Sequence, residues 1–263
     1  MSRKWFLAAA TAAAVAATGA AVAAKHDLPA YVTAALADPA RPADEKALDA
    51  DRKPADMIAF AGIEPGSRVM DIIPGQGYFT HIFAKVVGDK GHVYAFTPSE
   101  LDPMIQKHAP GSDPTKQFIA YPNVTVLHVP ANKLSAPESL DVVWTAQNYH
   151  DMHDEFMGPA DLAVVNKAVF DALKPGGHYI ILDHSAVAHS GFAATETLHR
   201  IDEAVVKKEV EAAGFELIEE SNILRNQADP RDKLVFDPSI RHRTDQFILK
   251  FQKPRHKRTQ ELP

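Results

Sequence analysis

The stretch VMDIIPGQGYFT, residues 69–80, decides the fold of this chain. Its apolar beginning predicts a buried strand, Gly75 and Gly77 predict a tight turn, and the residues from Tyr78 onward predict a helix. Glycines in such a turn let the backbone approach a ligand closely, and the helix offers unpaired N–H groups, so the pattern indicates a nucleoside or nucleotide site. A dinucleotide turn would carry a third glycine where Thr80 stands, which argues against a nicotinamide cofactor. A tight turn without a ligand is the alternative interpretation.

Outward from this stretch, short apolar runs alternate with amphipathic ones, which is typical of βα units in a mainly parallel sheet. Residues 225–243, before the last strand, are polar and hold no helical pattern, so the last two strands should pair antiparallel. The sequence predicts an α/β fold: a doubly wound, mostly parallel seven-stranded sheet with the last strand antiparallel. The expected strands are 68–73, 92–97, 124–129, 141–146, 178–184, 215–222 and 245–251. The expected helices are 78–87, 99–108, 160–173 and 198–213.

Three motifs make the chain resemble the class I (seven-stranded, Rossmann-like) S-adenosylmethionine-dependent methyltransferases. Residues 69–80 resemble that family's first motif, in which a strand ending in an acid runs into a Gly-x-Gly turn. LKPGG at residues 173–177 resembles the turn before its fifth strand, and EAAGF at residues 211–215 the approach to its sixth. The resemblance spans residues 56–254.

The resemblance implies S-adenosylmethionine as the cofactor and methyl transfer to a small molecule as the activity. The family usually places one acid after its second strand, for the ribose hydroxyls, and another after its third, for the adenine amino group. Thr97 and Pro130 stand at these places, so we expect weaker cofactor binding, for which Glu100 is a candidate to compensate. The residues that the resemblance places around the cofactor are Asp71, Pro74, Gly75, Gly77, Thr97, Asn132, Gln147 and Asn148.

Polar side chains are dense after the fourth and fifth expected strands, where an acceptor would meet the reactive methyl group. Because the transfer is an in-line displacement, the protein supplies alignment and, where needed, a base. His150 is the first candidate for that base and His184 the second. Asp151 is the third catalytic candidate, and capping of the helix that follows is its alternative role. For each histidine the alternative is a hydrogen-bonded structural role.

The histidines also raise the question of a metal, since imidazole and carboxylate ligands suit zinc, iron or manganese. His150 would have to combine with His153 and Asp154, or with His184 and His199. Neither spacing is a recognised ligand pattern, so the sequence predicts no metal.

The composition narrows the range of partners. A net charge of −6 gives no overall attraction to nucleic-acid phosphates, so we expect a small-molecule substrate and no nucleic acid. The absence of cysteine excludes disulfides, thiolate catalysis and cysteine-ligated zinc. The oligomeric state is not readable. Several arginines would suit an anionic acceptor, although neighbouring aspartates favour internal salt bridges. These arginines are Arg200, Arg225, Arg231, Arg241 and Arg243.

The first 24 residues predict a signal peptide: Arg3 and Lys4 precede an apolar run, and residues 21–23 supply a small-x-small cleavage site. Residues 2–7 resemble the twin-arginine export pattern with lysine in place of the second arginine, and residues 144–151 and 198–202 resemble predicted exported bacterial methyltransferases. An uncleaved anchor is the alternative, but the apolar run is short for a bilayer. We therefore expect an exported, periplasmic protein without stable membrane insertion after cleavage. Its expected parts are a signal peptide (1–24), a helical lead-in (25–57), a methyltransferase-like domain (58–254) and a basic tail (255–263).

Two other classes of function stay open. One is an exported, non-catalytic binding protein on the same fold, whose cofactor site has decayed or been reassigned; the missing acids at Thr97 and Pro130 are what it predicts. The other is a metal-assisted hydrolase or lyase built on the histidines, which would require a stoichiometric metal.

Overall fold

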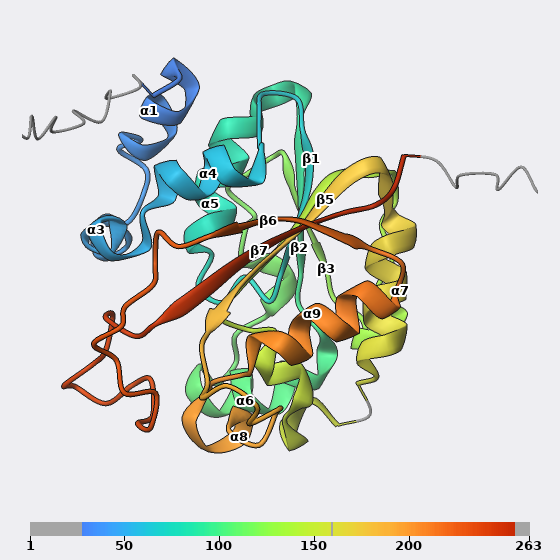
Figure 1. Ribbon diagram of the computed structural model, residues 1–263. Helices are drawn as coiled ribbons and strands as arrows, with labels where there is room; N and C mark the ends of the chain where they lie inside the picture. The colour runs from blue at the N-terminus through green and yellow to red at the C-terminus, as the bar shows by residue number, and fades with distance from the viewer. Residues whose placement is uncertain (1–27, 159, 256–263) are drawn as a thin grey trace, which may run out of the picture.

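The computed structural model describes residues 28–158 and 160–255. Seven strands form one sheet in the order β3-β2-β1-β4-β5-β7-β6 (Figure 1). Neighbouring strands run parallel, except that β7 lies antiparallel between β5 and β6. The predicted α/β sheet with its last strand reversed is therefore confirmed. The strands are β1 (Arg68–Ile72), β2 (His92–Phe96), β3 (Val124–Leu127), β4 (Leu140–Ala146), β5 (Leu173–His184), β6 (Glu216–Ser221) and β7 (Gln246–Gln252).

Helices cover both faces of this sheet (Figure 1). The α-helices are α1 (Ala30–Leu36), α2 (Ala43–Ala47), α3 (Asp49–Arg52), α4 (Pro54–Ala61), α5 (Tyr78–Val87), α6 (Asp102–His108), α7 (Leu162–Ala172), α8 (Thr195–Leu198) and α9 (Glu203–Ala212). The short 3-10 helices are η1 (Gly88–Lys90), η2 (Ser99–Leu101), η3 (Pro114–Lys116), η4 (Ala131–Lys133), η5 (His150–His153) and η6 (Glu155–Met157).

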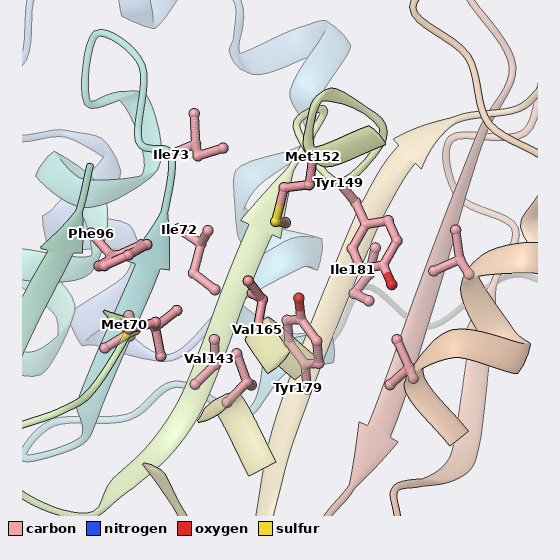
Figure 2. Close-up of a cluster of buried hydrophobic side chains, with 14 of the residues drawn as sticks. Met70, Ile72, Ile73, Phe96, Val143, Tyr149, Met152, Val165, Tyr179 and Ile181 are labelled. Atoms are coloured by element: carbon pink, nitrogen blue, oxygen red, sulfur yellow. The ribbon is translucent and has the colours of Figure 1, made fainter. Parts of the chain in front are cut away.

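Successive side chains of β1 point to opposite faces and so divide the core into two layers. Val69 belongs to the cluster that α1, α4 and α5 cover, together with Trp144 of β4. Met70 belongs to the opposite cluster, which α7 and α9 cover. Figure 2 shows this second layer, with Met70, Val143 and Val165 close together. Strands buried on both faces explain why the sequence shows continuous apolar runs here.

The prediction of one helix over residues 198–213 is wrong for its first residues. The chain leaves α8 at His199, which adopts a left-handed conformation with φ 52°. It enters α9 only after Asp202, whose side chain accepts a hydrogen bond from the N–H of Ala204. This N-cap satisfies an otherwise unpaired donor, so the helix begins there.

Two of the expected parts fall largely outside the described residues: the signal peptide (1–24) and all of the basic tail after Arg255. Between them, three short helices precede α4, which starts at Pro54 inside the expected lead-in. The limits of the four parts stay a prediction.

Candidate active site

The turn after β1 is built around a buried acid. Asp71 is 3% exposed, and the hydroxyl of Thr80, in the first turn of α5, donates to its Oδ2 at 2.6 Å. Burial raises the pKa of Asp71 to about 7, while the Thr80 hydrogen bond and the charge of Arg52 oppose the rise. Asp71 thus lies directly below the turn, where a cationic ligand group would stabilise its ionised form.

The turn itself is strained at its first residue. Ile73 has φ 55°, a conformation that a β-branched side chain rarely adopts, and Gly75 and Gly77 follow with φ 58° and 95°. Asn148, after β4, donates to the carbonyls of Ile73 (2.8 Å) and Ala146 (2.7 Å) and so ties the ends of β1 and β4 together. Nothing in the sequence pattern marked Ile73 as left-handed, because an isoleucine there reads as the continuation of the strand.

The two glycines of the turn have different surroundings. A Cβ on Gly77 would lie 2.5 Å from the ring of Phe118, whereas a Cβ on Gly75 would meet nothing within 4 Å. Gln117, next to Phe118, donates to the carbonyl of Gly75 at 2.6 Å. The segment before β3 therefore packs against Gly77, and Gly75 is the glycine that stays open to a ligand.

Thr97 and Pro130, which stand where the family usually has acids, follow β2 and β3. Thr97 is buried, and its hydroxyl has no hydrogen-bond partner among the described residues. Glu100 does not replace the missing acid, because both of its carboxylate oxygens accept from the N–H of Ala131, at 3.0 and 3.1 Å. The Oδ1 of Asn132 accepts from the N–H of Asp161 at 2.8 Å, which ties that side chain to the start of α7. Thr97 is thus the residue of this group whose polar atom lacks a partner.

The end of β4 holds the second strained residue of this edge. Gln147 has φ 62°, and its side-chain amide donates to Oε1 of Gln246, the first residue of β7, at 3.0 Å. Strained backbone of this kind persists where the surrounding structure holds it, and it gathers at functional sites.

His150, two residues after Asn148, contacts a buried carboxylate. Its Nδ1 is 2.8 Å from Oδ1 of Asp183, at the end of β5, and its backbone N–H donates to Oδ2 of the same residue at 2.8 Å. Burial opposes protonation of His150, but the charge of Asp183 and the hydrogen bonds to Asp151 and Asp183 outweigh it and raise its pKa to about 10. Asp151 does not cap the helix that follows: its carboxylate lies 3.1 Å from His150 Nε2 and 3.6 Å from His199 Nδ1.

His184 is in a different electrostatic situation. Its Nδ1 is 2.8 Å from the hydroxyl of Thr244, and its ring centroid is 6.3 Å from that of His150. Burial lowers the pKa of His184 to about 3, so the ring is neutral at physiological pH. A base of such low pKa is a weak proton acceptor, and the better-supported role for His184 is to line the cavity beside it.

That cavity has a volume of about 130 Å³. Of the residues expected at the site, it brings together Gln147 and His184, whereas Asp71, Gly75, Thr97, Asn132 and His150 do not line it. Most of its other lining residues lie on α3, on the connection between β6 and β7, and at the start of β7. They include Asp51, Arg52, Phe236, Arg241, His242 and Gln246.

The expected internal salt bridges hold most of the arginines. Arg200 is fully buried and pairs with Asp229 at 2.8 Å, and Arg231 pairs with Asp245 at 2.8 Å. Arg225 pairs with Glu203 and Asp245, and Arg243 donates to the carbonyl of Ser239. Among the described residues, Arg52 and Arg241, which both line the cavity, form no ion pair with a carboxylate.

Comparison with known proteins identifies methyltransferases as relatives. A ubiquinone/menaquinone biosynthesis C-methyltransferase, UbiE of Teredinibacter turnerae, is 31% identical over 134 residues, which are 51% of this chain and 49% of the relative. The UbiE of Shewanella woodyi is 26% identical over 73% of this chain and 66% of the relative. The chain thus spans about half to two thirds of the length of these relatives. No protein-family model matches it.

Solved structures show the same fold. A SAM-dependent methyltransferase from Aquifex aeolicus superposes with a TM-score of 0.52 at 19% identity, covering 80% of this chain and 97% of that one. The [4+2]-cyclase SpnF superposes with a TM-score of 0.53 at 17% identity, covering 78% and 81%. At such identities the likeness establishes the class I methyltransferase fold, and the cyclase shows that the fold hosts more than one chemistry.

The expectation of an exported, periplasmic protein is wrong. The relatives that carry the sequence similarity are named as enzymes of ubiquinone and menaquinone biosynthesis, and the comparisons give no support for export. The apolar N-terminal run on which the expectation rested lies outside the described residues. None of the described helices combines the length and the apolar composition needed to cross a membrane.

Proposed function

We propose that this chain, which has the class I methyltransferase fold and methyltransferases as sequence relatives, transfers a methyl group from S-adenosylmethionine to a small molecule. The main support is the set of residues at the edge of the sheet where β1 and β2 end. The strained turn after β1 contains the open Gly75, and the buried Asp71 and the unpartnered hydroxyl of Thr97 lie at the ends of these two strands.

The residues at this edge fit an adenosyl sulfonium with an amino-acid tail. Asp71 is placed to accept from an ammonium group, and the exposed backbone at Gly75 leaves room for a close approach. The Thr97 hydroxyl is the polar atom at the end of β2, the place of the ribose in this family. When bound, the cofactor supplies an electrophilic methyl group, so the chain has to align the acceptor and exclude water.

The acceptor is proposed to enter the 130 Å³ cavity beside Gln147 and His184. Its volume is below the few hundred Å³ of typical ligand sites, which fits the reacting end of a molecule better than a whole ligand. Arg52 and Arg241 offer guanidinium groups without a carboxylate partner in the described chain, and these favour an acceptor with anionic or carbonyl oxygens. The relatives' names place their own acceptors in quinone biosynthesis.

Calorimetric titration with S-adenosylmethionine and S-adenosylhomocysteine tests the proposal directly, with ATP as a control ligand. Binding of both sulfur compounds in the micromolar range, with no binding of ATP, is expected. A chain that binds neither at millimolar concentration is not a methyltransferase of this class.

A matched pair of variants then tests the site. Thr97→Val removes the hydroxyl that has no partner inside the protein, so the fold should be retained while cofactor affinity falls about three- to tenfold. Thr145→Val removes another buried, unpartnered hydroxyl, on the penultimate residue of β4, and should leave affinity unchanged because that side chain is 0% exposed. Equal affinities for the two variants would remove Thr97 from the cofactor site.

A further inference from the structure

Three possible metal-ligand atoms, from two distant parts of the chain, lie close together beside the candidate active site. They are His150 Nε2 and Asp151 Oδ1, both on η5 after β4, and His199 Nδ1, at the end of α8. Their separations are 3.1 Å from His150 to Asp151, 3.2 Å from His150 to His199, and 3.6 Å from His199 to Asp151. All three atoms therefore lie within 3.6 Å of one another.

These separations match the coordination shell of a transition metal. At bond lengths of about 2.0–2.2 Å, two ligand atoms of a tetrahedral ion lie about 3.4 Å apart, and adjacent ligand atoms of an octahedral ion about 3.0 Å apart. The three distances, 3.1, 3.2 and 3.6 Å, lie close to these values. Two imidazoles and one carboxylate are also a ligand set that zinc, iron and manganese use when one or more positions stay open.

A buried carboxylate holds the first of these ligands in place. Asp183 is 0% exposed, and it binds both the Nδ1 and the backbone N–H of His150. Because Nδ1 faces this carboxylate, Nε2 is the ring nitrogen of His150 that points into the cluster. A carboxylate behind a histidine ligand is the arrangement that orients metal-bound imidazoles in proteins.

The cluster is accessible and lies next to the proposed acceptor cavity. The side chains of His199 and Asp151 are 29% and 16% exposed, so an ion can enter. Phe236, which lines the cavity, packs on the ring of His199 with centroids 5.1 Å apart, and His184 links the cavity to His150. An open coordination position would face this neighbourhood.

We propose that His150, Asp151 and His199 form a binding site for one divalent transition-metal ion, with Asp183 as the residue that positions His150. The sequence predicted no metal from two other combinations, His150 with His153 and Asp154 or with His184 and His199, because neither fits a ligand motif. It did not suggest the set found here, whose third ligand lies 48 residues after the second. The site binds the ion whether or not the chain transfers methyl groups, so its test needs no cofactor and no acceptor.

The test is calorimetric titration of chelator-treated protein, free of any histidine tag, with Zn²⁺ and Mn²⁺. One Zn²⁺ per chain is expected to bind in the micromolar range or tighter, with Mn²⁺ weaker, as the general order of divalent affinities requires. Absence of stoichiometric Zn²⁺ binding overturns the proposal.

Two histidine variants make the test specific to the cluster. His199→Asn removes a ligand but keeps the left-handed backbone, which asparagine tolerates, and should weaken Zn²⁺ binding by at least about a hundredfold. His189→Asn is the matched control, because His189 is an exposed histidine with φ 67° outside the cluster. The proposal fails if His199→Asn binds Zn²⁺ like the unmodified chain, or if His189→Asn loses binding equally. Thermal unfolding of the metal-free variants verifies that both are folded.

Discussion

Asp183 binds His150 twice: its two carboxylate oxygens take the imidazole Nδ1 and the backbone N–H of that residue, each at 2.8 Å. Asp183 ends β5 and His150 follows β4, so the pair fixes the loop after β4 to the neighbouring strand. The same carboxylate also accepts from the N–H of His184. One buried side chain therefore sets the position of both histidines that the sequence nominated for catalysis.

This relationship predicts a large effect of a small change. Asp183→Asn turns one acceptor atom into a donor that faces a buried N–H, and it should lower the free energy of unfolding by about 1–3 kcal/mol. Asp113→Asn is the control, since Asp113 also accepts a backbone N–H but has an exposed side chain, and it should change stability much less than Asp183→Asn. Urea unfolding of the two variants gives both values; equal effects would mean that the Asp183 contacts carry no net stability.

The two glycines of the β1 turn predict unequal costs of the same substitution. Gly75→Ala meets open space and should cost only the strain of its positive φ, about 1–2 kcal/mol. Gly77→Ala carries the same strain and adds a clash with Phe118, for a total of about 2–4 kcal/mol.

Combining Gly77→Ala with Phe118→Ala isolates that clash. Without the Phe118 ring, Gly77→Ala should lower the free energy of unfolding by less than it does in the unmodified chain, so the effects of the two substitutions should not add. Additive effects in urea unfolding would show that Phe118 does not confine position 77.

Asp71 predicts a pH dependence of stability with a definite sign. Its pKa is about 7 in the folded chain against an ordinary value of 3.8, so the folded state holds an extra proton between these values. The contribution of Asp71 to stability therefore decreases as pH rises from about 4 to about 7, and the loss is complete above that range. Asp71→Asn cannot ionise and abolishes this component, while its amide oxygen still accepts from Thr80.

The measurement is the free energy of unfolding of both proteins at pH 5 and pH 8. The free energy of unfolding of Asp71→Asn, relative to that of the unmodified chain, should be higher at pH 8 than at pH 5. The contributions of groups common to both proteins cancel in this difference. A difference of zero, or of the opposite sign, would show that the folded chain does not raise the pKa of Asp71.

The buried pair of Arg200 and Asp229 predicts that one residue holds the long connection between β6 and β7. Arg200 also donates to the carbonyls of Ser185, after β5, and Lys233, in that connection. Arg200→Met leaves Asp229 as an unpaired buried charge and should cost about 3–5 kcal/mol. Arg225→Met, at a partly exposed pair, should cost about 1 kcal/mol. Thermal or urea unfolding ranks the two; the reverse order would assign the anchoring role to Arg225.

The sequence alone determined the sheet and its turn. Alternating apolar and amphipathic segments report which residues are buried, and burial is a local property that repeats with the period of a strand or helix. The reversed last strand followed from the polar, helix-free connection before it. The sequence did not predict the break in the helix at His199. The helix begins after Asp202 because of a side-chain hydrogen bond, and such a bond leaves the hydrophobic period of the sequence unchanged.

Only the tertiary structure decided which polar residues act together. Parallel strands deliver their ends to one edge, so the sequence could place His150, Asp151 and Asp183 near that edge, but it could not pair them. The pairing depends on register between β4 and β5 and on where α8 brings His199, and both are set by packing between residues far apart in the chain. The same holds for Phe118 against Gly77, because a contact across the sheet edge leaves no periodic trace in the sequence around either residue.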